Sequence, residues 1–259
     1  MEGSEKNSIR LGNLEIRCLD DLKELQATLD LQKRIWGFSS DDCVPPSLMI
    51  VAAEIGGLTI GVFSHGQMIG FSLSFPGFSQ SEEVGQQPCW YSHMTGVLPE
   101  FQGHGVGKRI KFYQRERALN AGVSLIKWTF DPLQIGNAYF NIERLGIIVR
   151  RYLPNLYGVT SNRFDAKLPT DRLVAEWHIA SVKVQSVIDN QDAEGVQIVQ
   201  TIKIPKQIAN LRASDSSAAQ KIQTQVRDEM QQAFADKLVV VGYHLEEEVG
   251  VYELGYLKD

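Results

Sequence analysis

The chain has 259 residues, of which 43% are hydrophobic and 22% charged, so it can bury a core and is not a disordered protein. Its formal net charge of -5 excludes the broad basic surface that nucleic acid requires. Its three cysteines, Cys18, Cys43 and Cys89, lie far apart, which argues against a disulfide framework and a zinc site. No histidine pair or carboxylate cluster has ligand spacing, so we expect no metal.

The N-terminus predicts a protein of the cytoplasm. Residues 1–13 form a polar leader without the apolar region of a signal peptide. The longest aliphatic run, Leu48 to Ala53, ends at Glu54 and is far shorter than the ~20 residues that cross a bilayer. We therefore expect no membrane partner.

The first elements are a short strand and two helices. Residues 14–19 alternate like a strand, and Asp21 with Glu24 three residues later resembles a capping box at the start of a helix. The buried stripe that we expect for this helix is Leu22, Leu25, Leu29 and Trp36. Pro45 and Pro46 suit the first turn of a second helix, which Gly56 and Gly57 end.

The middle of the chain predicts a hairpin followed by alternating strands and helices. Strands at 58–63 and 68–75 are joined through the turn 64–67, and the Gly/Ser/Gln-rich stretch 76–88 is expected to be a loop. The later strands and helices are expected at 89–98 (strand), 105–121 (helix), 123–130 (strand), 137–145 (helix) and 146–151 (strand).

The last part predicts a further α/β segment. Extended runs at 163–167 and 173–184 precede a polar break at 189–192. A strand at 196–204, a long helix at 214–234 and a hairpin of 237–245 with 249–257 follow. We expect an α/β (α+β) domain over 14–185 and a smaller α/β extension, 186–259, packed on it.

The segment Gln102 to Arg109 has the form of an anion site. It follows a strand and opens a helix, where free backbone N-H groups and the helix dipole attract negative charge. Lys108 and Arg109 stand at the helix end where cations are disfavoured by roughly 0.3 to 1 kcal/mol each. A bound polyanion reverses the sign of that electrostatic effect. The alternative is a helix that begins after a flexible turn.

Two common nucleotide motifs do not fit this segment. A Walker A loop needs a glycine where Gln102 stands and a hydroxyl residue where Arg109 stands. A dinucleotide fingerprint that starts at Gly103 or Gly105 lacks its third glycine. These departures argue against ATP, GTP and NAD.

The segment does match Q/R-x-x-G-x-G/A, through Gln102, Gly105 and Gly107, and here the sequence resembles the GNAT acetyltransferase superfamily. The runs SHMTGVLPEFQGHGVGKR, WTFDPLQIGNAYFNIERLG and YLPNLYG are similar to bacterial and archaeal GNAT proteins that carry a C-terminal extension. The resemblance covers roughly residues 14 to 180. It implies a mixed, mostly antiparallel central sheet flanked by helices, and acetyl-CoA or another acyl-CoA as cosubstrate.

The resemblance also implies which residues bind the coenzyme. The strand before the loop pairs through its backbone with the pantetheine arm, and the loop amides take the pyrophosphate. The residues placed beside the coenzyme in this way are Gly96, Val97, Leu98, Gln102, Gly103, His104, Gly105, Val106, Gly107, Lys108, Arg109 and Asn137.

Acyl transfer also needs a base, for which His93 is the first candidate. It shares one face of the strand with Tyr91, Thr95 and Val97, and some GNAT enzymes carry their base on this strand. The competing interpretation is a hydrogen-bonded core histidine. Glu54, at the end of its helix, and Asp131, in an Asp-Pro turn, are weaker candidates.

At the place of the acid that protonates the thiolate, the sequence departs from the GNAT pattern. The GNAT pattern L-Y-x-K-x-G, aligned on Gly146, places Ile142 where the catalytic tyrosine belongs. Tyr139 lies three residues earlier, nearly one helical turn away, and could bring its hydroxyl to the same place. Either Tyr139 replaces the acid or the thiolate leaves without one.

The acceptor is expected to be an amine of a small molecule or a peptide. Arg150, Arg151 and Tyr152 follow the second helix, where acceptor specificity could be set, although neighbouring arginines on a strand point to opposite faces. The sequence leaves open whether the protein forms a homodimer. Two alternatives to an enzyme remain: a non-catalytic acyl-CoA sensor, and an interaction module whose C-terminal piece fills the acceptor cleft.

Overall fold

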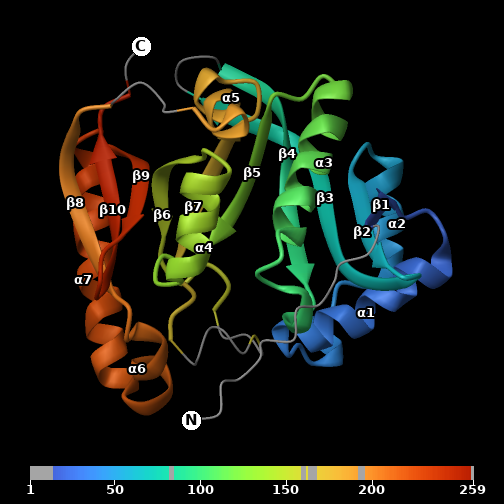
Figure 1. The fold of residues 1–259 in the computed structure, drawn as a ribbon, viewed down its shortest axis with the longest axis horizontal. Helices are drawn as coiled ribbons and strands as arrows, with labels where there is room; N and C mark the ends of the chain where they lie inside the picture. Colours follow the sequence, from blue (N-terminus) through green and yellow to red (C-terminus); the bar gives the residue numbers. More distant parts are fainter. Residues whose placement is uncertain (1–13, 82–84, 159–161, 163–167, 192–195, 258–259) are drawn as a thin grey trace, which may run out of the picture. The chain divides into compact units, whose positions relative to one another are not determined.

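The computed structural model describes residues 14–81, 85–158, 162, 168–191 and 196–257. The predicted leader 1–13 and the predicted extended run 163–167 lie outside these residues. The chain forms two compact units, one of residues 1–76 with 92–116 and one of residues 77–91 with 117–259. Figure 1 shows the elements of both. The predicted domain limits, 14–185 and 186–259, stay a prediction.

The strands of the first unit begin the sheet as an antiparallel meander. β1 (Leu14–Cys18), β2 (Leu58–Ser64) and β3 (Gln67–Ser81) are neighbours in this order, and β4 (Gly85–Val97) follows β3. Two residues with positive φ, His65 at 49° and Gly66 at 78°, join β2 to β3. Such a turn matches the twist of paired strands, and the predicted hairpin is confirmed.

Helix α1 (Leu22–Trp36) begins at Asp21, as predicted, because the Asp21 carboxylate accepts the N-H groups of Lys23 and Glu24. The capping box is incomplete, since the Glu24 carboxylate pairs with Arg17. The predicted stripe was partly wrong: Leu22 is 52% exposed, and Leu29 and Trp36 are half-buried. Asp21 fixes the first turn at the surface, so the buried face starts one turn later. The buried residues are Leu25, Thr28, Leu31, Gln32 and Ile35.

The remaining helices of this unit are η1 (Ser40–Asp42), α2 (Pro46–Glu54), η2 (Pro99–Phe101) and α3 (Val106–Asn120). α2 starts at Pro46, as the sequence predicts. Side chains of α3 hydrogen-bond to β3 and β4, across which the helix lies (Figure 1). One apolar cluster joins α1, α2, the strands and the first turns of α3.

The loop predicted at 76–88 was wrong, because β3 continues to Ser81 and β4 already starts at Gly85. Strand pairing, which sequence patterns do not reveal, overrides the weak strand propensity of serine and glutamine. Ser79 is buried and accepts a hydrogen bond from Lys127 Nζ at 3.1 Å. A polar residue is therefore stable at this buried position near the end of β3, because it has a hydrogen-bond partner there.

In the second unit, Trp90 and Tyr91 of β4 pair in parallel with β5 (Leu125–Phe130). β7 (Arg172–His178) then pairs antiparallel with both β5 and β6 (Ile148–Leu153). The predicted helix at 137–145 is α4 (Ile135–Tyr139) followed by a π-helix, η3 (Phe140–Arg144). Among the pairings of the described residues β4–β5 is the parallel one, which confirms a mixed, mostly antiparallel α/β fold.

The C-terminal part contains the predicted strand, long helix and hairpin. They are β8 (Ile198–Pro205), α7 (Ser216–Ala235), β9 (Val239–Leu245) and β10 (Val249–Gly255), with α6 (Ile208–Ser214) before α7. The extended run predicted to reach Val184 was wrong there, because α5 (Val182–Asp189) begins at this point. The Ser181 hydroxyl accepts the Val184 N-H, so a helix cap outweighs the strand preference of two valines.

Buried polar contacts hold this C-terminal part to the rest of the second unit. Asp171 is fully buried and accepts bonds from Arg227 Nε at 2.8 Å and Nη2 at 3.0 Å, and from the Tyr152 hydroxyl at 2.7 Å. The Tyr252 hydroxyl donates to the carbonyl of Pro132 at 2.7 Å. A buried carboxylate is stable only with partners of this kind. Of the helices described, none is long and apolar enough to cross a membrane.

Candidate functional site

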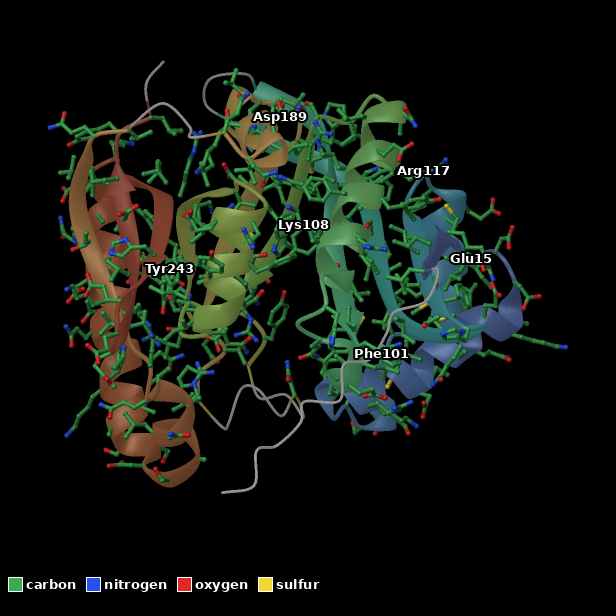
Figure 2. The ribbon with its side chains drawn as sticks, viewed as in Figure 1. Glu15, Phe101, Lys108, Arg117, Asp189 and Tyr243 are labelled. Atoms are coloured by element: carbon green, nitrogen blue, oxygen red, sulfur yellow. The ribbon has the colours of Figure 1, made fainter. Side chains whose placement is uncertain are left out.

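The glycine-rich loop lies in the first unit between η2 and α3, and its backbone needs two of its glycines. Gly103 and Gly105 both have φ of 78°, in the left-handed region that other residues avoid. Apart from the two chain neighbours, no heavy atom of the described residues lies within 4 Å of the place that a Cβ would take at either glycine. The loop is therefore exposed and open above both glycines. Figure 2 labels Phe101 and Lys108, which bracket it.

The first turn of α3 leaves hydrogen-bond donors unused. Arg109 N-H donates to the Gly105 carbonyl at 3.1 Å and so begins the helical ladder. Within the described part of the chain, the backbone N-H groups of residues 103–108 have no acceptor. Free N-H groups and the positive end of the helix dipole form an anion site. Lys108 is half-buried and its Nζ lies 5.3 Å from the centre of the Phe112 ring, while Arg109 is exposed.

Two side chains shape the loop from within. Gln102 Nε2 donates to the Val97 carbonyl at 2.9 Å, so the first residue of the motif ties the loop to the end of β4. His104 Nδ1 lies 2.8 Å from the Gln102 carbonyl and therefore donates to it, which leaves Nε2 as the outer acceptor. Val106, by contrast, is buried at 1% exposure and anchors α3 in the core.

The end of β4 is tightly packed. A Cβ on Gly96 would lie 2.6 Å from the Trp36 ring, so only glycine fits there. Leu98 N-H donates to the Ile69 carbonyl at 2.8 Å, and the Leu98 carbonyl accepts from Phe101. Since the Val97 carbonyl is bonded to Gln102, a ligand that pairs with residues 96–98 must use their remaining backbone groups.

His93 lies on the exposed face of β4 in the first unit, as the alternation predicts, while its neighbours Ser92 and Met94 are buried. Its ring meets Phe75 edge-on, with 5.8 Å between the ring centres. Desolvation by the surrounding protein lowers the pKa of the imidazole. A histidine that is neutral at pH 7 can accept a proton.

The second unit holds Asn137 and Tyr139, both on α4. Asn137 is exposed and its Oδ1 accepts a bond from Asn141 at 3.2 Å. Tyr139 is half-buried, and the guanidinium of Arg144 lies 5.9 Å from its ring centre. Ile142, which stands in the usual place of the acid, is 1% exposed and belongs to the core.

The two weaker candidates for the base, Asp131 and Glu54, and the two arginines proposed for acceptor specificity lie in different surroundings. Asp131 is buried and pairs with Arg212 of α6 at 2.7 Å, while its other oxygen accepts the Leu133 N-H. Glu54 is exposed at the end of α2. On β6, Arg150 is half-buried near Glu176 and Arg151 is exposed. Among the described residues, no three histidine, cysteine or acidic side chains gather as they would around a metal.

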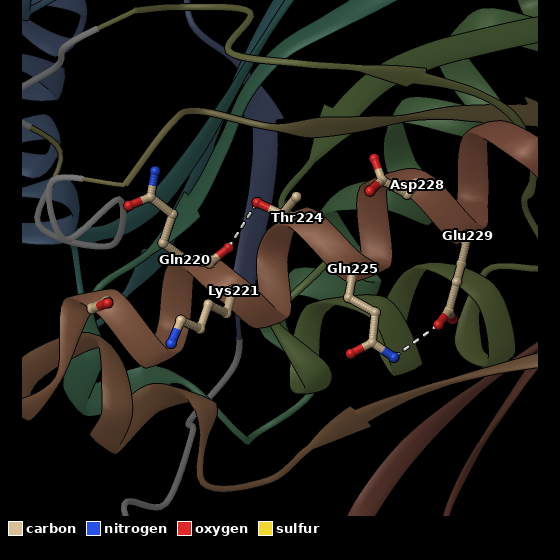
Figure 3. A pocket seen from close by; sticks show the side chains of 7 residues that line it. Gln220, Lys221, Thr224, Gln225, Asp228 and Glu229 are labelled. Carbon is tan, nitrogen blue, oxygen red and sulfur yellow. Dashed lines mark hydrogen bonds between the residues drawn. The ribbon is translucent and has the colours of Figure 1, made fainter.

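A shallow pocket lies elsewhere, on one face of α7 (Figure 3). The residues that line it are Ser217, Gln220, Lys221, Thr224, Gln225, Asp228 and Glu229. Four of them form two bonds within the helix: Gln225 Nε2 donates to Glu229 at 2.8 Å, and Thr224 donates to the Gln220 carbonyl at 3.0 Å. This polar helix face contains none of the predicted site residues.

The chain has the fold of GNAT acetyltransferases, as solved structures show. It matches a GNAT-family protein from Desulfovibrio desulfuricans with a TM-score of 0.50 and 13% identity, over 65% of this chain and 100% of that one. YncA from Salmonella typhimurium, solved with acetyl-CoA, matches with 0.50 and 16% over 66% and 96%. NAA60 from Arabidopsis thaliana, solved with a bisubstrate analogue, matches with 0.51 and 12% over 64% and 97%.

Neither a scan against protein-family models nor a search of curated proteins gave a match. The structural matches cover about two thirds of this chain, which is consistent with a GNAT-like part followed by an extension. The fold predicted from the Gln102 motif is thus confirmed, whereas the roles of individual residues stay predictions.

Proposed function

We propose that this protein is an acyl-CoA-dependent acyltransferase that moves an acetyl group directly from acetyl-CoA to an amine. The observation that carries the proposal is the open glycine turn at the start of α3, with its unused N-H groups, in a chain of GNAT fold. An anion site at this place suits the pyrophosphate of coenzyme A.

The coenzyme is proposed to bind along β4 and the loop. Backbone N-H groups of residues 103–108 take the pyrophosphate, with Lys108 and Arg109 as further donors and positive charges. The remaining backbone groups of residues 96–98 pair with the pantetheine arm. Asn137 is the proposed contact from α4. Tight packing at Gly96 and the bond between Gln102 and Val97 support a preformed strand end.

The proposed chemistry needs one proton removed and one supplied. The neutral nitrogen of the acceptor forms a bond to the thioester carbonyl carbon, and the carbon-sulfur bond breaks. His93 takes the proton that the nitrogen loses, and the Tyr139 hydroxyl gives a proton to the thiolate. The lowered pKa of His93 and its exposure support its role.

A non-catalytic acyl-CoA sensor is the second candidate, and Ile142 favours it. The side chain in the usual place of the acid is apolar and buried, so this position can supply no proton. A sensor binds acyl-CoA through the same loop and catalyses no transfer. Release of free coenzyme A thiol from acetyl-CoA, measured with a panel of amines, distinguishes the enzyme from the sensor. Binding of acetyl-CoA without release of thiol with any of the amines supports the sensor.

We expect acetyl-CoA to raise the thermal unfolding temperature, because a ligand that binds the folded state stabilises it by mass action. At 100 times its Kd the gain is about 2.7 kcal/mol, which corresponds to a shift of several degrees. Differential scanning fluorimetry with acetyl-CoA, coenzyme A, ATP and NAD at equal concentrations measures the effect.

ATP and NAD also contain a pyrophosphate, so they control for a general anion effect at the loop. They should produce much smaller shifts than either coenzyme A compound. Equal shifts from all four compounds would remove the argument for a coenzyme A site and leave an unspecific phosphate site.

A further inference from the structure

A buried lysine lies behind the strand segment that carries His93, and neutral polar groups are among its partners. Lys111 of α3 is 3% exposed, and its Nζ donates to Ser92 Oγ and to Gln114 Oε1, both at 3.0 Å. Gln114 is itself fully buried. Burial lowers the pKa of Lys111 to about 7. Nothing in the proposed chemistry uses this side chain.

The bonds around Lys111 have a defined direction. Gln114 Nε2 uses its two hydrogens on Ser74 Oγ at 2.6 Å and Ser92 Oγ at 3.1 Å. Ser92 Oγ thus accepts two bonds, and its single hydrogen points to Thr95 Oγ1 at 3.3 Å. We call these residues, together with Ser72, the Lys111 network.

The network ends on the backbone of β4. Ser72 Oγ donates to the Met94 carbonyl at 2.9 Å, so it accepts the hydrogen of Thr95, whose Oγ1 is also 2.9 Å away. Each hydroxyl therefore donates away from Lys111 toward the Met94 carbonyl. The residues that receive these bonds, Ser92, Met94 and Thr95, enclose His93 in the sequence.

Stability alone does not explain a lysine at this place. A buried ammonium loses its hydration, and apolar residues of similar volume often replace buried charged groups without loss of stability. Lys111 lies on α3, and the N-terminal end of this helix contains the free N-H groups of residues 103–108. The network thus links the helix of the proposed pyrophosphate site to the strand segment of the proposed base.

We propose that Lys111 is a positioning residue, which holds the β4 segment Ser92–Thr95 through Ser92 and Thr95 and so sets the direction of the His93 side chain. The inference rests on the proposed function only for the role of His93 in catalysis. The Lys111 network and its bonds to β4 lie wholly within the first unit.

The test compares Lys111→Met with Arg117→Met, which removes a positive charge from an exposed site on the same helix. We expect Lys111→Met to fold, to bind acetyl-CoA within threefold of the unaltered protein and to lose at least tenfold in acetyl transfer. After His93→Gln, the same substitution should lower the rate less than twofold further, because both act through one group. Arg117→Met should change none of these.

A second readout does not depend on turnover. Nuclear magnetic resonance of the His93 imidazole should show its pKa rising toward the ordinary value in Lys111→Met, because a released ring is better hydrated. Arg117→Met should leave the titration unchanged. If no acceptor is ever turned over, the proposed function fails while this titration still decides the role of Lys111.

Additive rate losses in the His93→Gln background, or an unchanged His93 titration, would overturn the proposal. Should Lys111→Met fail to fold, Thr95→Val removes one hydroxyl from the network and keeps a β-branched side chain. The same non-additive rates and the same change in titration are then expected from Thr95→Val.

The buried lysine also predicts a dependence of stability on pH. Its folded pKa, about 7, lies below the ordinary value of 10.5. Between these values the unfolded chain holds the lysine proton and the folded protein does not, so this group makes stability rise with pH. The unfolding temperature of the unaltered protein relative to Lys111→Met should therefore increase from pH 7 to pH 9. A constant difference would contradict a neutral, buried Lys111.

Discussion

Gly107→Ala is expected to stabilise the free protein and to weaken its binding of acetyl-CoA. Gly107 lies inside α3, and unlike Gly103 and Gly105 it does not have the left-handed backbone that requires glycine. A glycine in a helix costs up to about 1 kcal/mol relative to alanine. Helix stability therefore favours alanine, whereas close approach of a pyrophosphate to the first turn favours glycine.

The larger side chain of Gly107→Val should block the approach more completely. We expect affinity for acetyl-CoA to fall by about tenfold in Gly107→Ala and by at least a hundredfold in Gly107→Val. Isothermal titration calorimetry gives the affinities, and thermal unfolding without ligand gives the stabilities. If Gly107→Val is folded and binds acetyl-CoA normally, the pyrophosphate lies elsewhere.

Gly105→Ala is the matched comparison for this experiment. The open space above Gly105 admits a Cβ, but its φ of 78° does not suit alanine. Gly105→Ala should therefore lower the stability that Gly107→Ala raises. Opposite stability changes with weaker binding in both variants would separate the demands of the backbone from those of the ligand.

The sequence predicted the elements whose signals are local. Asp21 marks the start of α1 because a side-chain cap needs only residues two and three positions away. His65 and Gly66 mark the hairpin because a two-residue turn needs positive φ at both. The Gln102 motif works in the same way, since strand, turn and helix follow one another directly.

The sequence did not predict features that depend on residues far away in the chain. The sequence made Asp131 a weaker candidate for the base, but the structure pairs it with Arg212, which comes 81 residues later in the chain. Lysines are almost never fully buried, so the sequence does not predict the burial of Lys111, whose acceptor Ser92 belongs to another element. α3 has only a weak apolar stripe, which is consistent with a helix that buries polar side chains such as Gln114.

The π-helix η3 is a further feature that the sequence did not predict. Residues 140–144 have the composition of an ordinary helix, and the shift to longer hydrogen bonds leaves no mark in the apolar pattern. Such a change of pitch follows α4 directly and alters which side chains share a face. Ile142 is aligned with the usual acid through the motif that ends at Gly146, whereas the choice of Tyr139 in its place assumes the regular helical period.

Tyr139→Phe is expected to slow acetyl transfer by about a hundredfold or more while acetyl-CoA affinity stays within twofold. The substitution removes one hydroxyl from a half-buried ring, so packing against Arg144 is kept. General acid catalysis typically contributes 10² to 10⁴ in rate, and loss of the acid removes that factor. Steady-state rates with the true acceptor and calorimetric titration of acetyl-CoA measure the two effects.

Tyr256→Phe, at an exposed tyrosine near the end of the chain, controls for loss of a tyrosine hydroxyl as such and should change neither the transfer rate nor the acetyl-CoA affinity.

The loss of transfer rate in Tyr139→Phe should also depend on the leaving group, because a more basic thiolate needs a proton from the acid more than a weakly basic one does. If the acid acts on sulfur, an acyl donor with a more acidic thiol should narrow the difference between Tyr139→Phe and the unaltered enzyme. Full turnover by Tyr139→Phe with coenzyme A itself as the leaving thiol would make Tyr139 a packing residue. The thiolate then departs without a proton from this helix, since buried Ile142 has none to give.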